Sequence, residues 1–172
     1  VDAFLQDLEE NGFYDAWAST TYHCNYKGGL VEHTLNVIEY ALKLADTFKS
    51  KVSKESIVLC ACGHDTGKAY EYYVNNLLKS GKVSGSKPKK INPSLMIKSH
   101  AMRSLTIMSK FFTLTESEKV AILSHDGWYE NTNREYMLAL EELLYIIHSA
   151  DLYVARFVEP IKSYKGGDEI DL

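Results

Sequence analysis

The sequence predicts an all-α protein folded as a single helical bundle. Apolar residues recur at helical spacing along the 172 residues, and no run alternates between apolar and polar residues as a half-buried strand would. A chain of this length with 45% hydrophobic and 24% charged residues can bury the core of one domain. We expect this domain to span residues 1–158 and a flexible acidic tail to follow over residues 159–172.

Apolar stripes and end signals predict three helices in the first half of the chain. They run from Asp2 to about Trp17, from Leu30 to about Phe48 and from about Lys54 to His64. Asp2 suits the cap of the first helix, Gly12 interrupts it, and a loop follows over residues 18–29. In the second helix, the residues expected to face the core are Val31, Leu35, Ile38, Leu42 and Ala45.

The second half of the chain begins with a segment from Glu71 to Leu78 and the longest expected loop, Lys79 to Asn92. The helices predicted after it run from Pro93 through His100 to about Phe111, from Val120 to His125 and from about Arg134 to Phe157. Thr115 to Glu118 fits a capping box for the middle one of these, and Gly127 supplies its stop.

Charge and composition narrow the classes of function. A net charge of -4 and a pI of about 5.9 give no global electrostatic basis for binding a nucleic-acid duplex. Three cysteines, an odd number, favour a reducing cytoplasm over a disulfide framework. No apolar stretch is long enough to cross a bilayer, so no membrane partner is expected. The apolar residues from Met137 to Phe157 exceed the need of one surface helix, which is compatible with a homo-oligomer.

The chain starts with Val-Asp-Ala, without an initiator Met and without the basic and apolar parts of a signal peptide. Such a start is typical of a trimmed chain or of a domain taken from a longer protein.

The most informative motif is Gly63-His64-Asp65-Thr66-Gly67-Lys68, which places two metal-ligand side chains side by side at the end of an apolar helix. Neighbouring residues on a helix point about 100° apart, so His64 and Asp65 could share an ion only near a helix end. We expect the two glycines to relax the backbone there.

Further ligand-type residues lie on apolar faces of other predicted helices. His33 and His100, each taken alone, are well explained as satisfied core histidines. Asp151 is less easily explained, because a buried aspartate needs a cation or several donors. The six candidates taken together favour metal ions, and without thiolates the ion would be Mn, Fe, Ni, Co, Zn or Mg. They are His33, His64, Asp65, His100, His125 and Asp151.

This pattern resembles the HD-domain superfamily of metal-dependent phosphohydrolases, whose signature is a histidine, a His-Asp pair and a distant aspartate. His33 in Gly-Gly-Leu-Val-Glu-His-Thr-Leu, the pair His64-Asp65 and Asp151 match that signature, and the resemblance covers roughly residues 22–156. In wording, the motifs are most similar to the HD module of bacterial 3′-to-5′ exoribonucleases and to phage or mobile-element HD proteins.

The resemblance implies that His33, His64, Asp65 and Asp151 hold a first ion. Asp65 would also bridge to a second ion that His100 and His125 hold, so one or two divalent ions are expected. Water activated by metal would then attack phosphorus, and no protein nucleophile would be needed. Lys68 and Arg103 are candidates for contacts with substrate phosphate, although a solvated lysine and a surface ion pair explain them about as well.

The expected substrate is a nucleotide or a short oligonucleotide of RNA or DNA, because the acidic balance disfavours a long polyanion. Two other classes stay open. Some proteins of the same fold hold two irons and cleave bonds with dioxygen, and others are binding modules without catalysis. Around the ligands, His148 could orient Asp151, while His23 and Asp126 could serve a leaving-group proton or simply cap a helix.

Overall fold

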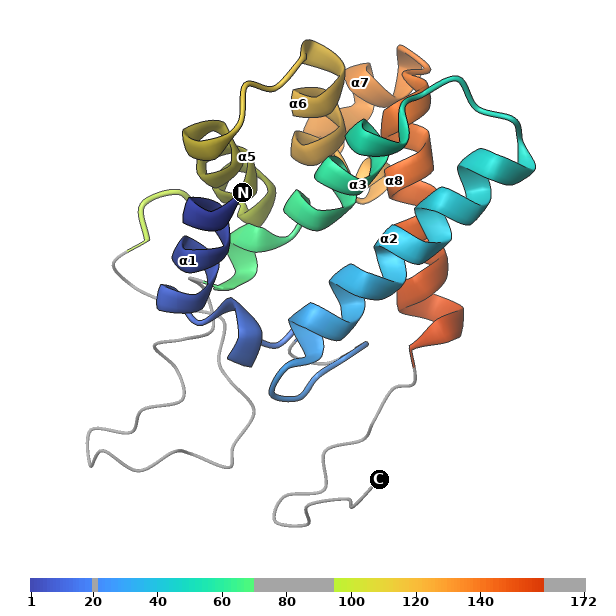
Figure 1. Cartoon of the computed structure of the whole chain (residues 1–172). Helices are drawn as coiled ribbons and strands as arrows, with labels where there is room; N and C mark the ends of the chain where they lie inside the picture. The colour runs from blue at the N-terminus through green and yellow to red at the C-terminus, as the bar shows by residue number, and fades with distance from the viewer. Residues whose placement is uncertain (20–21, 70–94, 160–172) are drawn as a thin grey trace, which may run out of the picture.

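The computed structural model describes residues 1–19, 22–69 and 95–159, and within these ranges every regular element is helical (Figure 1). The prediction of an all-α fold is therefore confirmed. The α-helices are α1 (Asp2–Glu10), α2 (Gly29–Thr47), α3 (Lys54–Gly63), α5 (His100–Phe111), α6 (Glu116–Leu123), α7 (Arg134–Leu138) and α8 (Glu142–Tyr153). Short helical turns complete them: η1 (Phe13–Asp15), η2 (Thr66–Lys68), η4 (Gly127–Tyr129), η5 (Asn131–Asn133) and η6 (Val154–Val158).

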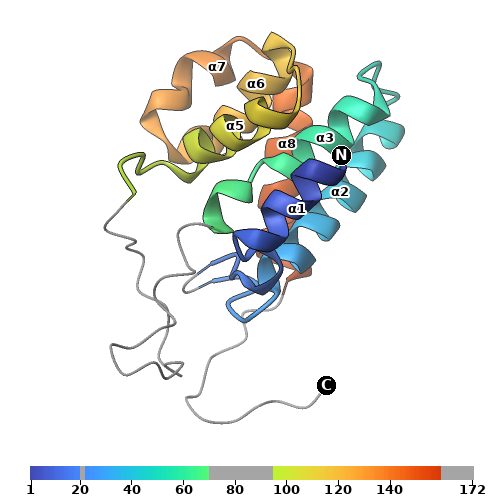
Figure 2. The ribbon, with the colours of Figure 1, turned by 60° about the vertical axis from the view of Figure 1, so that its left-hand side comes forward.

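Helices α3 and α8 form the centre of the bundle. α1 and α2 lie on one side of them, and α5, α6 and α7 lie on the other (Figure 2). α3 contacts α2, α5, α6 and α8, so it touches most of the other helices of the bundle.

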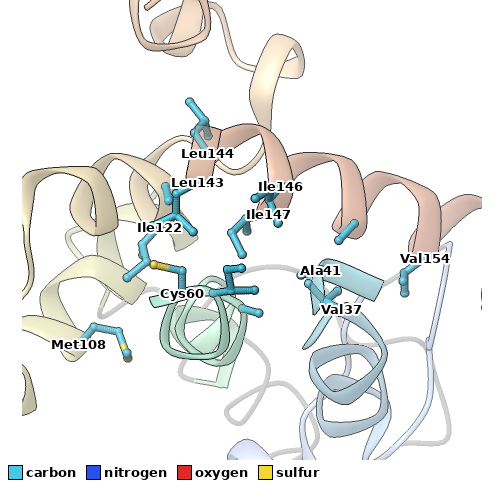
Figure 3. Packing of buried hydrophobic residues seen from close by; sticks show 14 of the residues in the cluster. Val37, Ala41, Cys60, Met108, Ile122, Leu143, Leu144, Ile146, Ile147 and Val154 are labelled. Carbon is cyan, nitrogen blue, oxygen red and sulfur yellow. The ribbon is translucent and has the colours of Figure 1, made fainter. Parts of the chain in front are cut away.

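The apolar core fills the space between these helices, as Figure 3 shows. Val37 and Ala41 from α2, Cys60 from α3 and Ile147 from α8 are fully buried there. Met108 and Ile122 extend the same core toward α5 and α6. Within the described ranges no helix is both long and apolar enough to span a membrane.

The face that α2 buries differs from the predicted stripe. Leu35 is 60% exposed, and the fully buried line instead runs through Leu30, His33, Val37 and Ala41. This line is the apolar face on which His33 was expected to lie, and α2 packs against both α3 and α8.

Several predicted helix boundaries were wrong. The first helix ends at Glu10 rather than at Trp17, and the expected interruption at Gly12 is confirmed, since Gly12 turns the chain with a φ of 75°. The helix expected from Pro93 begins at His100, because the side chain of Ser99 accepts the N–H of Met102 and caps it there. The expected last helix is split into α7 and α8, since Leu140 adopts a φ of 55° between them.

The helix expected from Val120 to His125 instead runs from Glu116 to Leu123, because its capping box starts it earlier. Other signals were predicted well. α3 begins at Lys54 and ends at Gly63, and the capping box of Thr115 and Glu118 is present at the start of α6. The expectations for Glu71 to Leu78 and for the loop Lys79 to Asn92 lie outside the described residues, as does the tail from residue 160. Glu159, which was expected to start that tail, is instead 3% exposed and packs into the core.

Candidate metal centre

All six predicted ligand residues come together in the core of the bundle. His33 lies on α2, His64 and Asp65 follow the end of α3, His100 starts α5, His125 follows α6, and Asp151 lies on α8. The side chains of His33, His64, His125 and Asp65 are at most 1% exposed, whereas those of His100 and Asp151 are each 20% exposed. The cluster is therefore closed on one side and reaches solvent on the side of His100 and Asp151.

The turn that presents His64 and Asp65 depends on two glycines, but not because they relax the backbone. The φ angle of neither Gly63 nor Gly67 is positive. Instead, a Cβ on Gly67 would lie 2.3 Å from the carbonyl oxygen of His100, and a Cβ on Gly63 would meet the side chain of Met108. Both glycines therefore allow the turn to pack directly against α5.

Asp65 is the centre of the cluster, and its two carboxylate oxygens face different histidines. Oδ2 lies 3.5 Å from Nε2 of His33 and 3.4 Å from Nε2 of His64. Oδ1 lies 3.4 Å from Nε2 of His100 and 3.5 Å from Nε2 of His125. Each oxygen thus shares a small space with one pair of imidazoles.

The spacing within each histidine pair fits a shared ion. The Nε2 atoms of His33 and His64 are 3.3 Å apart, and those of His100 and His125 are also 3.3 Å apart. Two nitrogens bound to one tetrahedral ion at about 2.0–2.1 Å would be separated by about 3.3 Å. Asp151 adds an oxygen to the first pair, with Oδ1 located 3.2 Å from Nε2 of His33.

One buried oxygen of the cluster has no hydrogen-bond donor, and a bound cation would compensate for this. Oδ1 of Asp65 is buried and accepts no hydrogen bond. A buried carboxylate oxygen without a donor costs free energy unless a cation lies beside it. The donors present therefore fit divalent ions.

The backbone fixes which ring nitrogen of two ligands faces the cluster. His64 Nδ1 lies 2.7 Å from the carbonyl oxygen of Ala61, and His125 Nδ1 lies 2.8 Å from that of Ile122. Because a carbonyl oxygen can only accept, Nδ1 carries the proton in both rings and donates it. Nε2 is then left with the lone pair that a metal ion requires.

The charges of the cluster compensate one another. Burial alone would raise the pKa of Asp65, but Lys68 and the imidazoles around it hold that pKa well below its usual range. Burial lowers the pKa of His125, yet Asp126 and Asp65 outweigh it and raise this pKa to about 9. The pKa of His100 falls to about 3, because burial and Lys68 both disfavour its charged form.

The two candidates for phosphate contacts are placed differently. Lys68 Nζ lies 2.6 Å from Oδ2 of Asp65, so this ammonium group reaches the cluster. Arg103 is 6% exposed, and its guanidinium donates to the carbonyl oxygens of Gly67, Ile97 and Lys98. These contacts support a structural role for Arg103, which ties the His-Asp turn to the residues before α5, and its contact with phosphate stays a prediction.

Residues that surround the ligands also have defined places. His148 donates from Nδ1 to the carbonyl oxygen of His125, at 2.8 Å, and so contacts the chain beside His125 rather than Asp151. Asp126 lies at the open side of the cluster, with Oδ2 3.3 Å from Nε2 of His100. The ring of His23 stacks on that of His33, with 4.7 Å between the centroids.

Sequence reasoning missed Glu159. Both of its carboxylate oxygens lie 3.1 Å from Nδ1 of His33, although 126 positions separate the two residues in the chain. No motif marks Glu159, because it follows the last ligand by eight positions in a stretch that reads as a fraying helix end. Only the course of the chain after α8 brings it to the cluster.

The fold and the site together define an all-helical protein with a His and Asp cluster suited to two divalent ions in its core. The sequence profile of the HD domain matches residues 30–156. The chain therefore belongs to the HD-domain family, which confirms the resemblance found in the sequence.

One curated relative is similar to part of the chain. The chain is 40% identical over 62 residues to the dihydroneopterin 2′,3′-cyclic phosphate phosphodiesterase of Methanocaldococcus jannaschii. The match covers 34% of this chain and 25% of the relative, so the chain spans about a quarter of the length of that enzyme. No solved structure gave a significant match. Family and relative agree in supporting a hydrolase of the HD class.

Proposed function

We propose that this protein is a metal-dependent phosphohydrolase that cleaves a phosphate ester of a nucleotide or a short oligonucleotide. The observation that carries the proposal is the position of Asp65 between two histidine pairs, with one carboxylate oxygen toward each pair at 3.4–3.5 Å. A pair of ions bridged by a carboxylate can clamp both the attacking and the leaving oxygen of a phosphoryl group.

The residues of the cluster have separate tasks in this proposal. His33, His64 and Asp151 would hold one divalent ion with Asp65, and His100 and His125 would hold the other. When bound, such ions supply Lewis-acid polarisation of the phosphate and lower the pKa of water toward neutrality. Hydrolysis then forms one P–O bond to the oxygen of water and breaks one ester P–O bond, and the leaving oxygen takes up a proton.

The open side of the cluster indicates where a substrate would enter. The side chains of His100, Asp151 and Asp126 are 20%, 20% and 28% exposed, whereas the histidines behind them are buried. The side chain of Lys68 is 15% exposed, and its ammonium group reaches the carboxylate of Asp65. A phosphoryl group beside Asp65 would therefore lie within reach of Lys68, whose charge favours an anionic substrate.

A phosphodiester is the first substrate to test. The relative from M. jannaschii is named for the hydrolysis of a 2′,3′-cyclic phosphate. The net charge of -4 also favours a small substrate over a long polyanion. We therefore expect activity on 2′,3′-cyclic mononucleotides and on generic phosphodiesters, with linear dinucleotides next.

The test compares the wild-type protein with two matched variants, Asp65→Asn and Asp46→Asn. Asp46 is an exposed aspartate on α2, so its variant controls for the loss of one carboxylate. Hydrolysis of bis-p-nitrophenyl phosphate, p-nitrophenyl phosphate and 2′,3′-cyclic AMP is measured with added Mn²⁺, and metal content is measured by elemental analysis. We expect hydrolysis by the wild type and by Asp46→Asn, and a loss of at least 100-fold in Asp65→Asn.

The same samples separate the competing functions. Retained iron and oxygen consumption without hydrolysis of any phosphate ester would favour an oxygenase of the same fold. A protein that neither binds metal nor hydrolyses these esters would be a binding module, and the proposal would be wrong.

A further inference from the structure

His33 differs from the other buried ligands in the way its outer nitrogen is satisfied. His64 and His125 follow the ends of α3 and α6, and each donates its Nδ1–H to a backbone carbonyl three residues earlier. His33 lies inside α2, which runs from Gly29 to Thr47, where the carbonyl groups already accept helical hydrogen bonds. The ring of His33 therefore needs an acceptor from another part of the chain.

Glu159 supplies that acceptor. Its Oε1 and Oε2 both lie 3.1 Å from Nδ1 of His33, and its side chain is buried. Asn36, one helical turn after His33 on α2, donates from Nδ2 to Oε1 of Glu159 at 3.1 Å. The carboxylate is thus held in place from the same helix that carries the histidine.

The backbone after α8 explains how Glu159 reaches this position. Residues Val154–Val158 form a π-helical turn, and the N–H of Glu159 donates to the carbonyl oxygen of Val154, five residues earlier. A regular α-helix would place Glu159 about 80° around the axis from Asp151. A π-helical turn holds more residues and so rotates less per residue, which returns Glu159 toward the face of Asp151. α8 and the turn after it therefore place one carboxylate at each nitrogen of the His33 ring. Glu159 faces Nδ1, and Oδ1 of Asp151 lies 3.2 Å from Nε2.

We propose that Glu159 is a positioning residue for the metal centre, which accepts Nδ1–H of His33 and thereby holds the Nε2 lone pair of that ring toward Asp65 and Asp151. This inference rests on the proposed function, because it assumes that His33 binds an ion. A carboxylate that accepts from the outer nitrogen of a ligand histidine fixes its tautomer and makes it a stronger ligand.

Direct binding of an ion by Glu159 is a less favourable explanation. His23, His33 and Glu159 also lie close enough to share an ion, but the nitrogen of His33 that faces Glu159 is Nδ1. An ion there would make both ring nitrogens of His33 metal ligands, which requires a fully deprotonated imidazole. A hydrogen bond needs only the neutral ring.

The test measures affinity for Mn²⁺ and Zn²⁺ by calorimetry and chelator competition in the wild type, Glu159→Ala and Glu159→Gln. We expect Glu159→Ala to weaken binding at the first ion by 10–100-fold. Glu159→Gln should weaken it less, because its amide oxygen can still accept Nδ1–H. Glu118→Ala is the matched control, since Glu118 is also buried and hydrogen-bonded but caps α6, away from the cluster. Its metal affinity should equal that of the wild type.

A double-variant cycle shows whether Glu159 acts through His33. In a His33→Ala background, Glu159→Ala should cause no further loss of metal affinity. In the wild-type protein with Zn²⁺ bound, nitrogen NMR should show that His33 is protonated at Nδ1. The inference would be overturned if Glu159→Ala bound metal as tightly as the wild type. It would also be overturned if Glu159→Ala weakened binding as much in the His33→Ala background as in the wild type. Lack of metal uptake by the wild type would overturn both proposals, whereas normal uptake and the expected cycle without ester hydrolysis would overturn only the proposed function.

Discussion

The Nε2 atoms of His100 and His125 lie 3.3 Å apart and face the same carboxylate oxygen, Oδ1 of Asp65. This pair repeats the spacing of His33 and His64 on the other oxygen. Each oxygen of Asp65 therefore faces a histidine pair of similar geometry, and this geometry supports our proposal of two ions.

We predict that His100 and His125 hold a second ion that can be removed separately. His100→Ala and His125→Ala should each reduce bound metal from two equivalents to one, because the first set of donors stays complete. Elemental analysis after gel filtration measures this. His148→Gln is the control, since His148 points its Nδ1 at a backbone carbonyl beside the cluster and should leave two equivalents bound. One equivalent in the wild type would contradict a second ion.

Metal binding should release protons near neutral pH. The pKa of His125 is raised to about 9 in the ion-free protein, and that of His33 is raised well above 6.5. The ring of His125 is therefore mostly protonated at pH 7.5 and must lose a proton before its Nε2 can bind an ion, and the raised pKa of His33 acts in the same direction. Calorimetry in buffers of different ionisation enthalpy should show proton release, and metal affinity should rise from pH 6.5 to 9. Proton uptake on binding would contradict this assignment.

The raised pKa values of His125 and His33 also make the stability of the protein without metal depend on pH. This stability should fall over the pH range in which metal affinity rises. A raised pKa contributes stability that is fully present below the unfolded value of about 6.5 and is lost as the pH rises through the folded value. We expect the melting temperature with chelator present to fall between pH 6.5 and 9, while the increase caused by Mn²⁺ grows. Thermal unfolding followed by circular dichroism measures both.

Replacement of the two glycines of the His-Asp turn should have unequal effects. In Gly67→Ala the new Cβ would lie 2.3 Å from the carbonyl oxygen of His100, and backbone cannot move aside without shifting α5. In Gly63→Ala it would meet the flexible side chain of Met108. We expect a loss of about 1–3 kcal/mol for Gly63→Ala and a larger one for Gly67→Ala. Urea unfolding of the ion-free proteins gives the comparison, and equal losses would contradict it.

Arg103 should affect stability more than substrate binding. Its guanidinium donates to three backbone carbonyl oxygens, and Lys cannot reproduce that set. Arg103→Lys should lower the free energy of unfolding by about 1–3 kcal/mol with an unchanged KM for the ester that is hydrolysed. Arg134→Lys, at an exposed position, should change neither. A KM increase of tenfold with unchanged stability would instead show that Arg103 contacts phosphate.

Helix content and ligand identity could be predicted because they depend on local patterns. Periodic apolar residues gave α2, α3 and α8 their approximate positions, and ligand-type side chains at the end of an apolar helix marked His64 and Asp65. Boundaries set by one side chain or one backbone angle were harder to predict. Ser99 is a favoured cap, but Pro93 offered an earlier start signal for the same helix, and the residue type of Leu140 does not indicate the positive φ that divides α7 from α8.

The sequence by itself determined the family, the all-α fold and the six ligand candidates, because these are written in residue types and their order. Only the tertiary structure decided which oxygen of Asp65 serves which histidine pair, and that Arg103 binds the backbone. Only it could bring Glu159 to His33 across 126 positions. Such contacts depend on how helices pack and on the π-helical turn after α8, and neither leaves a periodic signal in the chain.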